Sequence, residues 1–194
     1  MRLWTIQPLS LYKQLQTKGI LHCDGSLSEH LQSEAFVNAY SWLAEQMENR
    51  ISPSPSGVKF PFWAWHTLNW GHKRPDLRCM EFRSYAEPMV CLELDLPDHE
   101  VLLSDEENWH IVLNNGFYSN ADNEADDENE WEWLHSLSLE KQEVEKRKSW
   151  ERVFDVEPLN SGWNIRGRFV QATFWELRLS DVVSVRHFGK NRSK

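Results

Sequence analysis

The sequence has few cysteines, no long apolar run and a start unlike a secretory signal. Its three cysteines, Cys23, Cys79 and Cys91, form no C-x-x-C pair, so we expect neither a disulfide framework nor a structural zinc site. No apolar stretch reaches the roughly 18 residues of a membrane-spanning helix. The first residues also lack the apolar centre of a secretory signal. We therefore expect a cytoplasmic location and no membrane partner.

Common enzyme signatures are missing as well. The chain has no Walker loop, no G-x-G-x-x-G, no H-E-x-x-H and no G-x-S-x-G sequence. No metal site is expected, because His22, Cys23 and Asp24 are adjacent and cannot all point at one ion. Any activity must therefore use a less stereotyped site.

What the chain has in quantity is apolar and aromatic residues, which indicate a folded protein. It has 194 residues, 40% of them hydrophobic and 11 of them Trp. Alternating and helical spacings predict one α+β domain over residues 1–188, followed by a basic tail at 189–194. We expect a mainly antiparallel mixed sheet, two or three packed helices and an acidic surface loop.

Individual elements follow from local patterns. Strands are predicted at 3–7, 20–25, 60–66, 90–96 and 101–103, and helices at 9–18, from about 33 to 51, and at 138–152. Ser104 and Glu107 have the spacing of a capping box and predict a further helix start at Ser104. The last two β-rich stretches, 169–179 and 181–188, are too close for a crossover helix and are predicted to pair with each other.

The formal net charge of −9 comes mostly from one segment. Residues 121–132 include seven acids and no basic residue: Asp122, Glu124, Asp126, Asp127, Glu128, Glu130 and Glu132. Like charges repel and disfavour compact structure, which predicts a solvated loop over 119–135. The segment from Asp122 to Glu132 could instead bind a basic protein partner or imitate nucleic-acid charge.

An aromatic and basic stretch follows a Pro-rich loop. Residues 57–83 have five Lys or Arg against two acids, together with Trp63, Trp65 and Trp70. Indole rings stack on bases and Arg pairs with phosphate, so this stretch could bind a nucleotide. The alternative is that the Trp side chains belong to the core and the charges form surface ion pairs.

Glu176 is the candidate acid of a late strand. Strand alternation places it on the apolar face with Val170, Ala172 and Phe174, where burial would raise its pKa. Alternatively, Glu176 pairs with Arg178 or Arg186. Glu93 and Asp95 share the polar face of another strand and are expected to face water, although such a pair could share a proton or position a metal.

Several segments together resemble a bacterial and phage family catalogued as domain of unknown function 3841. The segments are LWTIQ at 3–7, FWAW at 62–65, RPDLR at 74–78, VLLSD at 101–105, WHIVLN at 109–114, SWERVFD at 149–155 and QATFWEL at 171–177. The resemblance covers nearly the whole chain. It implies relatives, and it carries no activity to transfer.

The order of elements is also similar to that of ADP-ribosyltransferase-like folds. Such folds open with a strand and a helix, and place an acid on a late strand to stabilise charge on the nicotinamide ribose. This similarity implies Glu176 as catalytic residue and NAD as substrate. The candidate ligand-binding residues are Thr5, Tyr40, Trp63, Trp65, His66, Arg74, Arg78 and Gln171. The chain departs from the pattern at its first strand, with Arg2 and Thr5, and has no Glu-x-Glu pair near Glu176.

The sequence is therefore compatible with two functions. The first is a nucleotide-binding protein with ADP-ribosyltransferase-like chemistry, in which the Trp63 to Arg78 stretch and Glu176 share one cleft. The second is a non-enzymatic interaction protein that uses its acidic segment. The sequence leaves open whether the protein is an enzyme.

Overall fold

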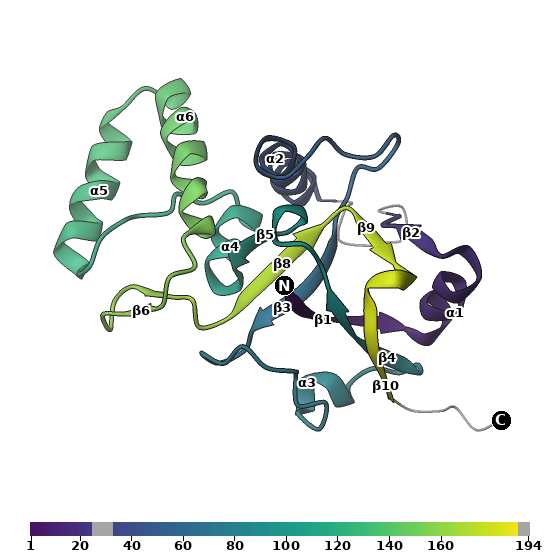
Figure 1. Ribbon diagram of the computed structural model, residues 1–194. Helices are drawn as coiled ribbons and strands as arrows, with labels where there is room; N and C mark the ends of the chain where they lie inside the picture. The colour runs from purple at the N-terminus through teal and green to yellow at the C-terminus, as the bar shows by residue number, and fades with distance from the viewer. Residues whose placement is uncertain (25–32, 190–194) are drawn as a thin grey trace.

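The computed structural model describes residues 1–24 and 33–189, and its largest element is a six-stranded antiparallel sheet (Figure 1). The strands lie in the spatial order β10 (Val182–Phe188), β4 (Met89–Asp95), β1 (Arg2–Pro8), β3 (Phe62–Thr67), β8 (Val170–Phe174) and β5 (Leu102–Asp105). Neighbouring strands come from distant parts of the sequence. The α+β class predicted from the sequence is confirmed.

One face of the sheet packs against an apolar layer. Alternate residues such as Leu3 and Leu92 lie on this face and are fully buried, as expected for period-two alternation. They contact Leu15 of α1 (Leu9–Lys18) and Leu177 of β9 (Glu176–Arg178), which pairs with β2 (Ile20–His22). The helix α1 ends at Gly19, whose φ of 78° suits glycine, as the sequence predicted.

The opposite face has a second, aromatic core at the β3–β8–β5 side. Trp42 of α2 (Glu34–Arg50), Trp109 of α4 (Glu106–Leu113) and Trp150 of the 3-10 helix η4 (Trp150–Phe154) form it. The Trp42 and Trp150 rings meet edge to face with centroids 5.4 Å apart. The Trp150 indole N–H donates to the Gly116 carbonyl at 2.7 Å, so its polar atom is satisfied inside the core.

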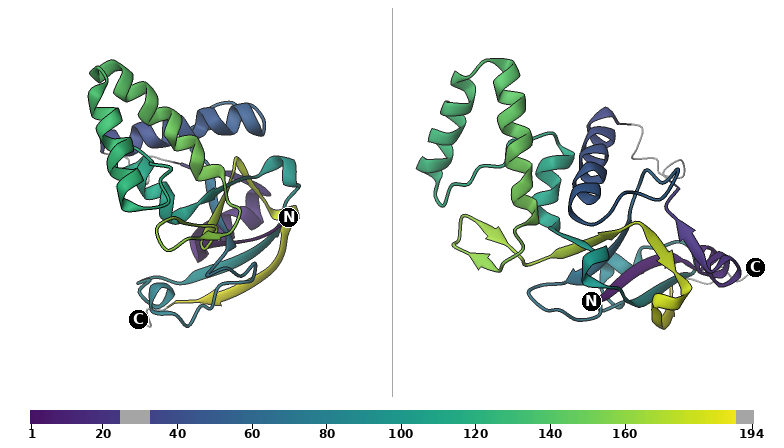
Figure 2. Two further views of the ribbon diagram at one scale, coloured as in Figure 1. Left: turned by 90° about the vertical axis from the view of Figure 1, so that its left-hand side faces the viewer. Right: turned by 45° about the horizontal axis from the view of Figure 1, so that its top comes forward.

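The acidic segment is a helix, and the predicted loop over 119–135 is wrong. The helix α5 (Glu124–Ser136) and α6 (Leu139–Ser149) form a hairpin that projects from the body (Figures 1 and 2). Asn123 caps α5 by accepting the Asp126 backbone N–H at 3.0 Å. Acids in a first helical turn face the positive end of the helix dipole, which offsets the repulsion on which the loop prediction rested.

Two further predictions of local structure are corrected. The β-rich stretches at the C-terminal end do not pair with each other: β8 lies between β3 and β5, whereas β10 pairs with β4. Helix α4 is capped by Asp105, whose carboxylate accepts the Asn108 backbone N–H at 2.9 Å, while Ser104 stays in β5. Asp105 is fully buried, and its second oxygen accepts the Gly167 N–H at 2.6 Å, so both carboxylate oxygens have a partner.

The remaining short elements connect these layers. They are α3 (Met80–Arg83), η3 (Asp98–Glu100), η5 (Leu179–Asp181) and the hairpin of β6 (Leu159–Asn160) with β7 (Ile165–Arg166). Across residues 1–24 and 33–189, no helix is long and apolar enough to cross a bilayer. Gly25, the last residue of the strand predicted at 20–25, lies outside the described residues.

Candidate functional site

A single line of residues crosses all six strands on the face that also holds the aromatic core. Directly paired positions in an antiparallel sheet share a face, so the register defines this line without ambiguity. Its members, in spatial order, are Ser184, Glu93, Trp4, Trp65, Gln171 and Ser104. We call this set the cross-sheet row.

Three members of the cross-sheet row have buried polar atoms that make no hydrogen bond within the described part of the chain. They are Trp4 Nε1, Gln171 Nε2 and Ser104 Oγ. The three residues are 6%, 9% and 1% exposed. A buried polar group without a partner costs about 1–3 kcal/mol, so folded proteins rarely retain one without a reason. The three lie on β1, β8 and β5 of one sheet, which makes the row the candidate site for a ligand that presents hydrogen-bond acceptors.

The β4 end of the row is charged and already partnered. Glu93 accepts a hydrogen bond from the Ser184 hydroxyl at 2.8 Å, and Arg2 lies 3.5 Å from its other oxygen. The expectation that Glu93 faces water is therefore wrong in part, since its side chain is only 23% exposed. Asp95, at 56% exposed, does face water.

Two histidines lie beside the row. The ring of His72 is 5.2 Å from that of Trp4 and 4.2 Å from that of His66. Burial, followed by the proximity of His72, lowers the pKa of His66 below its ordinary value. A neutral imidazole therefore lies next to the row at neutral pH. Its Nδ1 is 2.9 Å from the Thr67 hydroxyl.

The predicted ligand-binding residues separate into distinct places. Trp65 and Gln171 are both in the cross-sheet row. Trp63 is two residues from Trp65 and therefore on the same face, and its ring packs 6.1 Å from that of Tyr40 and 5.6 Å from that of Trp109. Trp63 and Tyr40 thus pack against the second core, which for Trp63 is the alternative that the sequence left open.

Thr5 lies on the other face of the sheet. Its register partner is Leu92, which belongs to the first apolar core. Its hydroxyl donates to the Trp63 carbonyl at 2.7 Å and accepts from Gln7 Nε2 at 2.8 Å. Thr5 therefore ties β1 to β3 and is not on the face of the row.

The basic residues of the aromatic stretch are on the surface. Arg78 forms a two-pronged ion pair with Asp76 at 2.8 Å, which raises the pKa of its guanidinium. Arg74 is exposed, and its charge acts on the buried thiol of Cys91. Burial dominates at that thiol and raises its pKa to about 11. Of these two arginines, Arg74 is the one whose charge is felt at a strand of the main sheet.

The turn between Leu68 and Gly71, which follows β3, is strained. Asn69 and Trp70 both have positive φ, 49° and 67°, as the two central residues of a tight hairpin turn require. Trp70 is bulky and adopts this conformation at a cost. Its backbone N–H donates to the Arg168 carbonyl at 2.9 Å, and this bond joins the turn to the segment that leads into β8.

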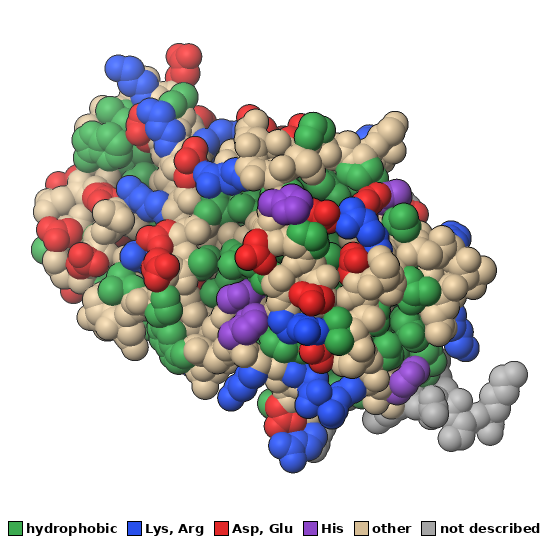
Figure 3. Space-filling model, viewed as in Figure 1, with side chains coloured by type: hydrophobic (Ala, Val, Ile, Leu, Met, Phe, Trp, Pro, Cys, Tyr) green, Lys and Arg blue, Asp and Glu red, His purple; other side chains and the backbone are tan. Residues whose placement is uncertain are grey.

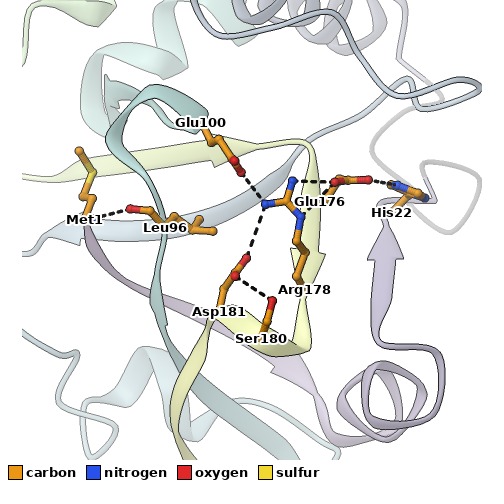
Figure 4. A network of polar contacts seen from close by, with 8 residues as sticks. All are labelled: Met1, His22, Leu96, Glu100, Glu176, Arg178, Ser180 and Asp181. Atoms are coloured by element: carbon orange, nitrogen blue, oxygen red, sulfur yellow. Dashed lines mark hydrogen bonds and ion pairs between the residues drawn. The ribbon is translucent and has the colours of Figure 1, made fainter.

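Glu176 is part of an ion-pair network at the other end of β8 (Figure 4). Its carboxylate contacts His22 at 2.8 Å and Arg178 at 2.7 Å, while Arg178 reaches Glu100 at 2.6 Å. These hydrogen bonds, first from His22 and then from Arg178, lower the pKa of Glu176. The expected rise through burial is wrong, and the predicted pairing with Arg178 is confirmed. Trp175 interrupts the strand, so Glu176 leaves the main sheet for β9.

A cleft of about 210 Å³ adjoins this network. Glu176, Arg178, Glu100 and His99 line it. Glu176 follows Gln171 by five residues, which corresponds to a separation of up to about 17 Å along extended chain. The register therefore does not bring Glu176 and Trp65 together, and one small ring could not contact both. Within the described residues, no group of three or more His, Cys, Asp or Glu is placed to hold a metal ion.

Comparison with known proteins places the chain in a family. The family model described as Domain of unknown function (DUF3841) matches residues 2–183. The chain belongs to the DUF3841 family. No curated protein matches it. No solved structure matches it either.

The sequence alone did not identify the whole site of this DUF3841 protein. The sequence patterns predict Ser104 as the start of a helix and Glu93 as a residue facing water, and they do not single out Trp4. Period-two alternation reveals which residues share a face of one strand, but it cannot say which residue of another strand lies opposite. A Trp, Gln or Ser at an inward position on several strands is the sequence signal that could have indicated the residues of the cross-sheet row.

Proposed function

We propose that this protein binds a nucleotide on the cross-sheet row. The observation that supports the proposal most directly is the set of three buried, unpartnered polar atoms on Trp4, Gln171 and Ser104. The indole N–H and the amide NH₂ are donors only, so the ligand must present acceptors, such as a carbonyl oxygen, a ring nitrogen or a phosphate oxygen.

The neighbouring side chains suit a flat, anionic ligand. Trp65 is half-buried and central in the row, where its indole can stack on a base. Arg2 and Arg74 are the cations that could pair with phosphate. NAD is the ligand to test first, because its bases, carboxamide and pyrophosphate together offer acceptors, flat rings and negative charge.

Thermal shift with NAD and a matched pair of variants tests this proposal. Trp4→Phe keeps an aromatic ring and removes the unpartnered N–H, so the unliganded protein should be at least as stable as the parent. The same variant should bind NAD more weakly. Trp133→Phe, at a 47% exposed position on α5, is the control and should leave binding unchanged. No shift of the parent at millimolar NAD would refute nucleotide binding.

For the reaction, we propose Glu176 as the carboxylate that stabilises positive charge on the ribose when nicotinamide leaves with the bonding electron pair and the oxygen of water or of an acceptor hydroxyl bonds to the ribose carbon, losing its proton to solvent. The ion pairs with His22 and Arg178 favour the ionised form that this role needs. Because Glu176 is five residues from Gln171, a ligand that contacts both would have to be extended. Glu176→Gln should abolish nicotinamide release and leave NAD binding intact; unchanged release would exclude Glu176 from catalysis.

A second candidate function is supported by the surface of α5. Its acidic side chains are largely exposed on a projecting hairpin, and red acidic atoms gather on that part of the surface (Figure 3). Such a surface attracts a basic partner. Deleting residues 122–132 would remove most of a packed helix, so neutralising the exposed acids one by one is the cleaner test.

A further inference from the structure

A second site lies away from the cross-sheet row, beside the acidic helix. A cleft of about 370 Å³ is formed by α4, the segment that leads to α5, the first turns of α5 and the β6–β7 hairpin. Figures 1 and 2 show the hairpin next to the lower end of α5. Three features of its lining point to one class of ligand.

The walls of the cleft are aromatic. Phe117, Tyr118, Trp131 and Trp163 all line it. Trp131 meets Phe117 nearly at right angles, with centroids 5.4 Å apart, so the two rings are fixed against each other. Trp163 comes from the hairpin and is 48% exposed, although it lines a cleft. The faces of aromatic rings attract cations, and indole does so best.

The charges that line the cleft have one sign. Glu107 of α4 and Asp127 of α5 contribute carboxylates, and the described lining includes no Lys or Arg. Glu107 has only a loose partner, Arg168, at 3.9 Å. Asp127 makes no ion pair with the described residues. Two carboxylates among aromatic rings favour a cation that can be partly desolvated.

Tyr118 is the third feature. It is 7% exposed, and it lines the cleft. Burial, and next the charge of Asp105, raises the pKa of Tyr118 to about 12. The hydroxyl therefore stays protonated at neutral pH and its oxygen can accept a hydrogen bond from a ligand N–H.

We propose that this cleft binds an organic cation, the guanidinium or ammonium group of a basic peptide segment. This inference rests on the second candidate function and names its site: the rings of Trp131 and Trp163 hold the cation while Asp127 and Glu107 neutralise it. It is independent of nucleotide binding on the cross-sheet row. A partner that bound only the exposed acidic side chains of α5 would not contact the rings of Trp131 and Trp163.

Isothermal titration with an Arg-Gly repeat peptide, and with the same peptide in which citrulline replaces each Arg, tests the cation requirement. Citrulline keeps the shape and removes the charge, so only the Arg peptide should bind. Free methylguanidine should compete if a single guanidinium group is recognised. Equal binding of both peptides, or no binding of the Arg peptide, would overturn the proposal.

Matched variants separate the cleft from general acidity. Trp163→Ala should weaken binding about 3- to 30-fold, the range of a partly desolvated cation–π contact. Trp133→Ala removes a Trp of equal exposure outside this cleft and should have no effect. Asp127→Asn should weaken binding more than Glu128→Gln on the same helix. If the two charge variants weaken binding equally and Trp163→Ala has no effect, the acidic surface binds the peptide and the cleft does not. All four variants are at exposed or half-exposed positions, so circular dichroism should confirm an unchanged fold.

Discussion

Replacing Ser104 by Ala should stabilise the unliganded protein. Ser104 is 1% exposed in β5, and its hydroxyl makes no hydrogen bond within the described part of the chain. Burying an unpaired polar group costs about 1–3 kcal/mol, and the substitution removes that group while losing only one atom of packing. We expect the free energy of unfolding to rise by about 1 kcal/mol, and Tm by about 2–4 °C, for a chain of this size.

Ser149→Ala is the matched control. Ser149 is also buried, at 4% exposed, but its hydroxyl donates to the Lys146 carbonyl at 2.6 Å and accepts the Tyr118 N–H at 2.9 Å. Its loss leaves a buried N–H unpaired and should lower stability by about 1–3 kcal/mol. Urea unfolding followed by circular dichroism measures both effects. The reasoning is refuted if Ser104→Ala destabilises the protein as much as Ser149→Ala does.

Three other substitutions test further parts of the account. Glu176→Gln should destabilise the protein at pH 7. The pKa of Glu176 is lowered in the folded state, so its stabilising contribution is fully present above the ordinary pKa of 4.5 and is lost as the pH falls through the folded-state pKa. Urea unfolding across pH would contradict this if the difference from the parent persisted in acid. Asp105→Asn should lower the free energy of unfolding by about 1–3 kcal/mol, because an NH₂ group would replace the oxygen that accepts the Gly167 N–H and two donors would face each other. Equal urea midpoints for the variant and the parent would contradict this. Trp150→Phe should cost a similar amount, about 1–3 kcal/mol, by leaving the Gly116 carbonyl without its indole donor, and an unchanged Tm would argue against that bond.

The sequence predicted those elements whose pattern is local. Helix α1 and strand β4 appear within one or two residues of their predicted bounds, because helical spacing, a terminal Gly19 and strict alternation are contained in a single window. The same holds for the start of α2 after Ser33. These patterns do not depend on the residues that pack against or pair with the element in the folded protein.

Features that depend on distant contacts were not predictable. The two C-terminal β-rich stretches looked like a hairpin, yet each pairs with a strand from an earlier part of the chain. The acidic segment looked like a loop because its charges repel, and the cap at Asn123 and the packing of Trp131 on Phe117 outweigh that repulsion. The alignment of Trp4, Trp65 and Gln171 likewise exists only through register.

The Trp4 indole N–H offers the most direct test of ligand binding on the cross-sheet row. In a ¹H–¹⁵N spectrum of the indole groups, this N–H should shift downfield on titration with NAD as it gains an acceptor, whereas the Trp150 N–H, already bonded to the Gly116 carbonyl, should stay in place. A Trp4 resonance that does not move at saturating NAD, or that moves no more than Trp150, would contradict the account.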